Sequence, residues 1–287
     1  MRVKNDYWSF EINPSKGCQI EAGMVHLESG WADLLPPEKY NAPSFLMLPY
    51  SNRIKDGFFN WYGNEYQLSY PEKHALHGPV RKMAWKCIYE ASEEGHFFIE
   101  VKAYDNPLKW PFAFSAFYKV SLEGKEVKHK LFIKNEEEIP VPFGGGFHPY
   151  FLRSILGAQD IVQTNLGVES VYPTLEPNFP NQEPVANDLV LRLNDNCQLA
   201  AEDFIDDVFI WSKGSAHLFW PNAGLQLEIT GSSNLKYLVF YNPEEDFFAI
   251  EPVANINDSL NNKLTEAVEI DPGQEIEMEM IWRLTFR

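Results

Sequence analysis

The stretch Phe112–Ile133, with the sequence FAFSAFYKVSLEGKEVKHKLFI, specifies a fold more directly than any other part of the chain. Apolar and polar side chains alternate broadly along 112–122 and again along 127–133, and many of the apolar ones are β-branched or aromatic. This alternation is typical of strands with one buried face. The intervening EGK at 123–125 predicts a tight turn, so the two strands are expected to pair antiparallel.

Short runs of the same kind occur on both sides of this stretch. They lie at 7–12, 24–28, 97–104, 189–193, 216–220, 225–229, 235–241 and 275–286. Helices are expected to be minor, with 31–35 long enough for one helical turn. Many short strands separated by turns predict an all-β protein, a large antiparallel β-sandwich with few short helices. The proline-rich segment 169–187 is expected to be a long surface loop, and residues 1–287 to form a single domain.

Composition excludes several classes of protein. Of the 287 residues, 45% are hydrophobic and 15% aromatic, which is typical of a globular protein, and the net charge is -17. Nucleic acid and anionic membrane surfaces are therefore not expected partners. The N-terminal segment has no apolar core of a signal peptide. The three cysteines are far apart and never in a Cys-x-x-Cys pair, so we expect no disulfide framework, no metal site and a cytoplasmic protein.

A second informative stretch is Gly144–Phe151, with the sequence GGGFHPYF. Its glycines remove side-chain bulk and permit backbone angles that other residues avoid, and His148 then lies between aromatic residues and a proline. The stretch predicts a positioned imidazole. It fits either a catalytic histidine or a buried structural histidine that follows a glycine turn.

Polar residues near other predicted strands are further candidates. Arg53 follows an apolar strand and fits either a ligand-binding guanidinium or a surface ion pair. His77 precedes a glycine in a predicted loop, and Asp206 and Asp207 begin an apolar strand; such positions also occur in solvated turns without a function. Glu251 ends an apolar run, where burying a carboxylate is costly unless it is paired, so it is a candidate general base.

Six short motifs follow one another along residues 52 to 275. They are Asn52-Arg53-Ile54 with Gly57 and Phe58, Leu76-His77-Gly78, Gly146-Phe147-His148-Pro149-Tyr150-Phe151, Asp206 with Phe209, Ile250-Glu251-Pro252, and Pro272-Gly273-Gln274-Glu275. In this order they resemble the aldose 1-epimerase (mutarotase) family. The resemblance implies a β-sandwich with an open sugar cleft. It also implies that Glu251 is the general base, that His148 is the general acid, and that Arg53, His77 and Asp206 bind and orient the sugar.

The chemistry of anomer exchange agrees with those residue types. A base removes the proton of the C1 hydroxyl while an acid protonates the ring oxygen, and a carboxylate and a histidine can do this near neutral pH. No metal or organic cofactor is required, and the expected partner is a small-molecule sugar. Candidates for an aromatic contact with the sugar are Trp61, Tyr62, Tyr150 and Phe209.

The sugar itself and the oligomeric state stay open. Galactose-acting mutarotases usually have a second glycine after His-Gly and an asparagine before it, whereas here Pro79 follows Gly78 and residues 72–75 read EKHA. The cations Arg81 and Lys82 add a phosphorylated aldose as an alternative, as in the related hexose-6-phosphate epimerases.

Two further classes remain alternatives. One is a noncatalytic sugar-binding protein on the same scaffold, since β-sandwiches carry many functions. The other is a glycoside hydrolase that uses Glu251 together with Asp206 or Asp207 as its paired carboxylates.

Overall fold

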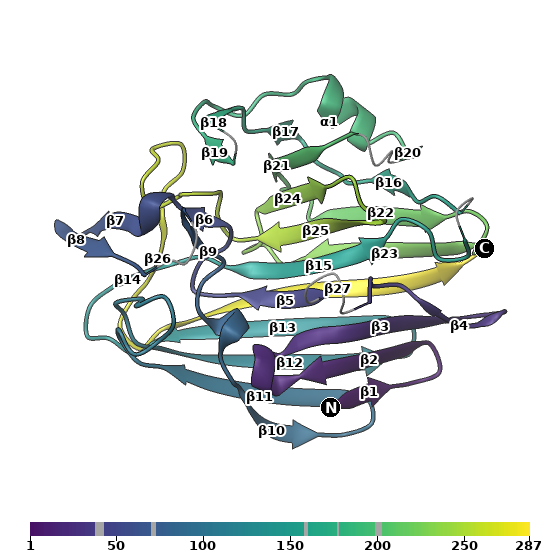
Figure 1. Cartoon of the computed structure of the whole chain (residues 1–287), viewed down its shortest axis with the longest axis horizontal. Coiled ribbons are helices and arrows are strands. Elements are labelled where there is room, and N and C mark those ends of the chain that lie inside the picture. The colour runs from purple at the N-terminus through teal and green to yellow at the C-terminus, as the bar shows by residue number, and fades with distance from the viewer. Residues whose placement is uncertain (38–42, 70–72, 158–159, 177, 199–202) are drawn as a thin grey trace.

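A computed structural model describes residues 1–37, 43–69, 73–157, 160–176, 178–198 and 203–287 of the protein (Figure 1). Within these ranges the strands form two large sheets, one of ten strands and one of nine, and every strand pair is antiparallel. The fold is therefore the large antiparallel β-sandwich that the alternating sequence predicts.

The first sheet contributes the face on which the candidate site lies. In spatial order its strands are β1 (Arg2–Lys4), β2 (Trp8–Asn13), β3 (Gln19–Leu27), β5 (Ser44–Met47), β15 (Gly146–Leu152), β25 (Phe247–Val253), β24 (Tyr237–Asn242), β21 (Ile205–Ile210) and β17 (Ser170–Val171), with β4 (Gly30–Asp33) paired to β3. Strands β5, β15 and β25 are neighbours although about a hundred residues separate each from the next in the chain.

The second sheet covers the other side of the core. Its order is β10 (Lys86–Glu90), β11 (Glu94–Val101), β12 (Phe114–Glu123), β13 (Glu126–Asn135), β27 (Glu275–Phe286), β23 (Leu225–Gly231), β22 (Ser215–Trp220), β16 (Gln163–Asn165) and β20 (Cys197–Gln198). The predicted hairpin at 112–133 corresponds to β12 and β13, whose register places Glu123 opposite Glu126. Side chains along β13 alternate strictly between partly exposed and buried, as its sequence predicts.

Smaller elements extend from the sandwich. They are the strand pairs β6 (Arg53–Ile54) with β9 (Ala75–Leu76), β7 (Phe58–Trp61) with β8 (Asn64–Gln67), β14 (Val141–Phe143) with β26 (Val268–Ile270), and β18 (Thr174–Glu176) with β19 (Phe179–Pro180), together with the 3-10 turns η1 (Pro14–Lys16), η3 (Lys55–Gly57) and η4 (Val80–Lys82). Strands β6 to β9 gather at the left-hand end of the sheets in Figure 1.

Large aromatic side chains fill the space between the two sheets. Trp8 of β2 and Phe151 of β15 both pack against Trp282 of β27, with ring centroids 6.3 Å and 5.3 Å apart. All three side chains are fully buried. Burial of this apolar surface is the main source of the stability that holds the two sheets together.

Three local expectations were wrong. Residues 189–193 were expected to form a strand but lie in the helix α1 (Asp188–Leu193), because the Asn187 side chain accepts a hydrogen bond from the Val190 amide and caps the first turn. Residues 31–35 were expected to form a helical turn, but 31–33 lie in the strand β4, which pairs with β3. The expected loop at 169–187 contains β17, β18 and β19. In the part of the chain described, no helix is long and apolar enough to cross a membrane.

Candidate functional site

Strand register places the two most informative polar residues directly opposite each other. In the pairing of β15 with β25, Gly146 lies opposite Val253 and Tyr150 opposite Ala249, so His148 lies opposite Glu251. Because side chains of opposed residues project to the same face of a sheet, the imidazole and the carboxyl group meet. Nε2 of His148 lies 3.1 Å from Oε1 of Glu251.

This face of the first sheet is the one turned away from the sandwich core. Phe147 and Phe151 point into the core, so His148 and Tyr150 between them point outward. The same alternation places Asp206 of β21 on the outer face, because Ile205 before it belongs to the core. Neighbouring strands β15, β25, β24 and β21 thus present their polar side chains on one surface.

The glycines before His148 allow the backbone to approach β25 closely. Gly146 has a φ of +153°, and a Cβ added there would lie 2.2 Å from the carbonyl oxygen of Pro252. Gly145 has a φ of +129°, and its amide donates to the side-chain oxygen of Asn255 at 3.2 Å. Only glycine fits at Gly146, so this residue fixes the position of the strand that carries the imidazole.

The backbone next to the paired strands β6 and β9 brings Asn52 and His77 to the site. Asn52 and His77 both have left-handed backbone conformations, with φ of +52° and +57°. The Asn52 amide donates to Nδ1 of His77 at 3.1 Å, and the His77 amide donates to the Asn52 carbonyl oxygen at 2.8 Å. Two non-glycine residues strained in this way and bonded to each other are typical of a functional site. Gly78 completes the loop, since a Cβ there would lie 1.8 Å from the Leu48 carbonyl oxygen.

Those hydrogen bonds fix the protonation of His77. Because Nδ1 accepts a hydrogen bond, the neutral ring carries its proton on Nε2. Burial lowers the pKa of His77 well below its ordinary value, and the nearby His148, Arg81 and Arg53 lower it further. At neutral pH His77 is therefore an uncharged hydrogen-bond donor.

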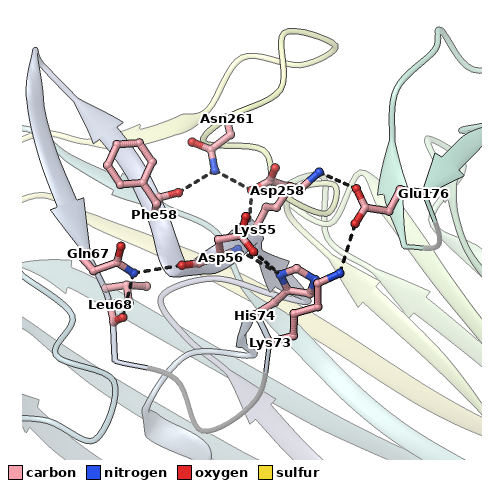
Figure 2. Close-up of polar contacts among 10 residues, drawn as sticks. All are labelled: Lys55, Asp56, Phe58, Gln67, Leu68, Lys73, His74, Glu176, Asp258 and Asn261. Atoms are coloured by element: carbon pink, nitrogen blue, oxygen red, sulfur yellow. Dashed lines mark hydrogen bonds and ion pairs between the residues drawn. The ribbon is translucent and has the colours of Figure 1, made fainter.

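A polar network outside the site holds the segment that carries Arg53 (Figure 2). The Asp258 amide donates to the Arg53 carbonyl oxygen at 2.8 Å, and the Asp258 carboxylate accepts from the Lys55 amide at 2.9 Å. Nδ1 of His74 accepts from the Asp56 amide at 3.0 Å. His74, in the segment 72–75 that the sequence analysis singled out, thus contributes to this support; Glu72 lies outside the described residues.

The five residues to which the family resemblance assigns roles line one cavity, whereas Asp207 does not. It has a volume of about 750 Å³, and Arg53, His77, His148, Asp206 and Glu251 all contribute to its wall. The Arg53 guanidinium is oriented by its hydrogen bond to the Asn52 side-chain oxygen at 2.9 Å. This is a volume into which a monosaccharide fits, with polar groups converging from two sides.

The contact between His148 and Glu251 requires a hydrogen between Nε2 and Oε1, because two lone pairs at 3.1 Å would repel each other. Burial raises the pKa of Glu251 well above its ordinary value, and the Asp206 charge raises it further while Arg53 lowers it. Burial lowers the pKa of His148 to about 3. Both shifts disfavour charge, so burial favours the state in which the carboxyl group carries the proton and the imidazole is neutral. The second carboxyl oxygen of Glu251 is buried without a hydrogen-bond partner.

Of the four aromatic candidates, only Tyr150 lines the cavity. Phe209 points into the core and is fully buried. Trp61 donates to the Pro140 carbonyl oxygen at 3.0 Å, and Tyr62 donates to the Glu269 carboxylate at 2.8 Å, so both belong to the surroundings of the β7–β8 pair. No residue of that pair lines the cavity.

Sequence reasoning missed several residues that line the cavity. Phe45 of β5 stacks on His148 with centroids 4.3 Å apart, and Tyr241 of β24 lies opposite Asp206 in the strand register. Phe204 is 67% exposed at the cavity. Asn52 was not predicted as a site residue, although asparagine is enriched among non-glycine residues with a left-handed backbone.

Comparison with known proteins agrees with this architecture. The model of the aldose 1-epimerase family matches residues 32–283. YphB of Escherichia coli (strain K12) is 24% identical over 284 residues, which cover 90% of this chain and 92% of that protein. A galactose mutarotase-like protein from Clostridium acetobutylicum superposes with a TM-score of 0.84 at 17% identity, covering 100% of this chain and 95% of the other.

A more distant structure has a similar fold. Galactose 1-epimerase from Lactobacillus acidophilus NCFM superposes with a TM-score of 0.75 at 14% identity, over 99% of this chain and 93% of that one. At these identities the structural matches establish the fold, while the family model spans most of the sequence. The chain therefore belongs to the aldose 1-epimerase family.

Proposed function

We propose that this protein is a mutarotase that interconverts the α and β anomers of an aldose. The observation that carries the proposal is the direct contact of His148 with Glu251, a buried acid–base pair in the wall of a cavity that accommodates a monosaccharide. Ring opening needs one proton removed from the C1 hydroxyl and one delivered to the ring oxygen, so a pair that holds one proton is sufficient.

The proton balance gives each member a role. In the reactive state Glu251 is a carboxylate and His148 an imidazolium. The carboxylate takes the C1 hydroxyl proton while the imidazolium protonates the ring oxygen, the bond from C1 to that oxygen breaks, and the aldehyde forms. Rotation about the C1–C2 bond and reclosure return both protons. Ring opening turns a charged pair into a neutral pair, which burial favours.

Other cavity residues fit roles in holding the sugar. The neutral His77 can donate from Nε2 to an oxygen that becomes a carbonyl, and the Arg53 guanidinium can bind neighbouring hydroxyls. Asp206 can accept hydrogen bonds from hydroxyl groups. Tyr150, whose ring lies 4.7 Å from that of His148, can contact an apolar sugar face.

The experiment that tests the proposal is saturation-transfer NMR on a panel of free aldoses, measuring the rate of exchange between anomers. His148→Asn is expected to lower kcat by about 10²–10⁴-fold, because asparagine keeps a polar side chain but cannot deliver a proton. The exposed His26, on β3, provides the matched control: His26→Asn should exchange anomers at the wild-type rate.

The exchange rate, measured together with sugar binding, distinguishes a mutarotase from a noncatalytic binding protein. A protein that binds a sugar by calorimetry but leaves exchange at the uncatalysed rate would be a noncatalytic binding protein and would refute the proposal. Glycoside hydrolysis requires two carboxyl groups as acid and base. Glu251 and Asp206 both line the cavity, but the group in direct contact with Glu251 is an imidazole, which favours proton exchange on a free sugar.

The pH dependence of kcat/KM should reflect the protonation of Asp206. Burial raises the pKa of Asp206 to about 6, with Arg53 lowering it and Asp207 raising it. Above pH 6 the group is a carboxylate that accepts hydrogen bonds; below pH 6 it is protonated and loses that capacity. We expect kcat/KM to fall about tenfold per pH unit below pH 6. Asp206→Asn should have a lower kcat/KM and no such fall between pH 5 and 7; an unchanged profile in this variant would assign the titration to another group.

A further inference from the structure

The charge of the cavity is opposite to the charge of the chain. The sequence holds 24 Lys and Arg against 41 Asp and Glu. Yet the described residues that line the cavity include four cationic side chains and only two carboxyl groups, and one of these, Glu251, is in contact with His148. An excess of cations in this one place, in so acidic a chain, indicates selection for an anionic ligand.

Three of these cations form one side of the cavity, which we call the basic edge: Lys16, Arg81 and Lys82. We infer that the basic edge binds an anionic substituent of the sugar, a phosphate, sulfonate or carboxylate carried on a carbon other than C1. The inference rests on the proposed function, and it names the class of aldose on which the acid–base pair acts.

Backbone contacts hold the two segments of the basic edge together. Lys16 belongs to η1, and Arg81 and Lys82 belong to η4, more than sixty residues later. The Gly17 amide donates to the Met83 carbonyl oxygen at 2.9 Å, and a Cβ on Gly17 would lie 2.4 Å from the Arg81 carbonyl oxygen. Gln19 also donates to that Arg81 oxygen, at 3.2 Å. The cations are thus brought together by tertiary contacts.

The basic edge is adjacent to the acid–base pair. The Arg81 guanidinium lies over the Phe45 ring, 5.6 Å from its centroid, and that ring stacks on His148 with centroids 4.3 Å apart. The guanidinium and the imidazole therefore both lie close to one aromatic ring. A single aldose can place C1 at the acid–base pair and an anionic group at the basic edge.

The chemistry of the three side chains fits an oxyanion. A planar guanidinium can donate two parallel hydrogen bonds to phosphate, sulfonate or carboxylate, and ammonium groups add charge without fixed geometry. Lys16 is 53% exposed and forms an ion pair with Glu21 at 3.0 Å, so its contribution is shared and screened by salt. Arg81, closer to the reaction centre, is expected to contribute most.

Calorimetry can test the basic edge without relying on catalysis. We expect glucose 6-phosphate or glucuronate to bind at least about tenfold more tightly than glucose, a difference of about 1.4 kcal/mol. Including both compounds distinguishes a phosphate site from a carboxylate site. Raising KCl from about 0.05 to 0.5 M should weaken binding of the charged sugar and leave that of glucose nearly unchanged.

Variants then locate the contact. Arg81→Gln should reduce the ratio of charged-sugar affinity to glucose affinity by about tenfold or more. Lys82→Gln should reduce the same ratio by about threefold. Lys86→Gln is the matched control, because Lys86 is exposed on the adjacent strand β10 and does not line the cavity. Its ratio should match that of the wild-type protein.

The outcomes separate this inference from the proposed function. Equal affinity for charged and neutral sugars, or a preference that survives in both variants, would overturn the basic edge. If charged sugars bind preferentially but no aldose exchanges anomers faster than in buffer, the basic edge stands as a binding site and the mutarotase proposal fails. If neutral sugars exchange anomers rapidly but charged sugars do not bind preferentially, the mutarotase proposal stands and the basic edge fails.

Discussion

Replacing Glu251 by glutamine is expected to lower kcat for anomer exchange by about 10²–10⁴-fold, because the amide cannot accept the C1 hydroxyl proton. The change is nearly isosteric, and glutamine can still hydrogen-bond to His148 across the 3.1 Å contact. The fold should therefore remain intact. It should even unfold at a slightly higher temperature at neutral pH, since a buried carboxyl group whose pKa is raised destabilises the native state above its ordinary pKa.

The measurement is the exchange rate by saturation-transfer NMR, combined with thermal unfolding followed by circular dichroism. Glu244→Gln provides the matched control, because Glu244 is an exposed residue in the turn between β24 and β25. A Glu251→Gln protein that exchanges anomers at the wild-type rate would remove Glu251 from the mechanism. Loss of the folded signal instead would assign it a structural role.

Gly146→Val is the second substitution with a large expected effect. The added Cβ would lie 2.2 Å from the Pro252 carbonyl oxygen and 2.9 Å from the Val253 Cα, and both are backbone atoms that cannot rotate away. The φ of +153° adds strain for a branched side chain. We expect a loss of about 3 kcal/mol or more and a Tm about 10 °C lower. In any protein that still folds, separation of β15 from β25 should lower exchange activity strongly.

Gly30→Val separates the clash from the backbone strain. Gly30 also has a positive φ, +112°, but a Cβ there would meet no atom within 4 Å. This control should therefore lose much less stability and keep its activity. Equal losses of stability in the two variants would show that backbone strain, and not the approach of β15 to β25, is responsible.

The site depends on the register of strands that are distant in sequence. His148 and Glu251 are about a hundred residues apart, yet one antiparallel register places them opposite each other. A shift of one residue would turn one of the two side chains toward the core and separate the pair. Gly146 opposes such a shift, because a residue with a Cβ in its place would clash with the Pro252 carbonyl oxygen.

Much of the fold was predictable because its signals are local. Alternation with a period of two identifies strands such as β12 and β13, and Gly124 at the turn between them fixes their pairing. The helix α1 was missed because its apolar residues at 189–193 look like a short strand, and the cap by Asn187 depends on one hydrogen bond. Short apolar runs are ambiguous between helix and strand until their neighbours are known.

By itself the sequence determined long strands such as β12, β13 and β27, the glycine-dependent conformation before His148, and five polar residues whose order resembles a family of sugar isomerases. Only the tertiary structure decided that those five residues line one cavity and that Glu251 touches His148. It also decided which residues lie elsewhere, namely Trp61, Tyr62 and Phe209, and it brought Lys16 to the same cavity as Arg81 and Lys82. The physical reason is that alternation determines which face of a strand a side chain occupies. Which strands become neighbours depends on long-range pairing that buries both sheets at once.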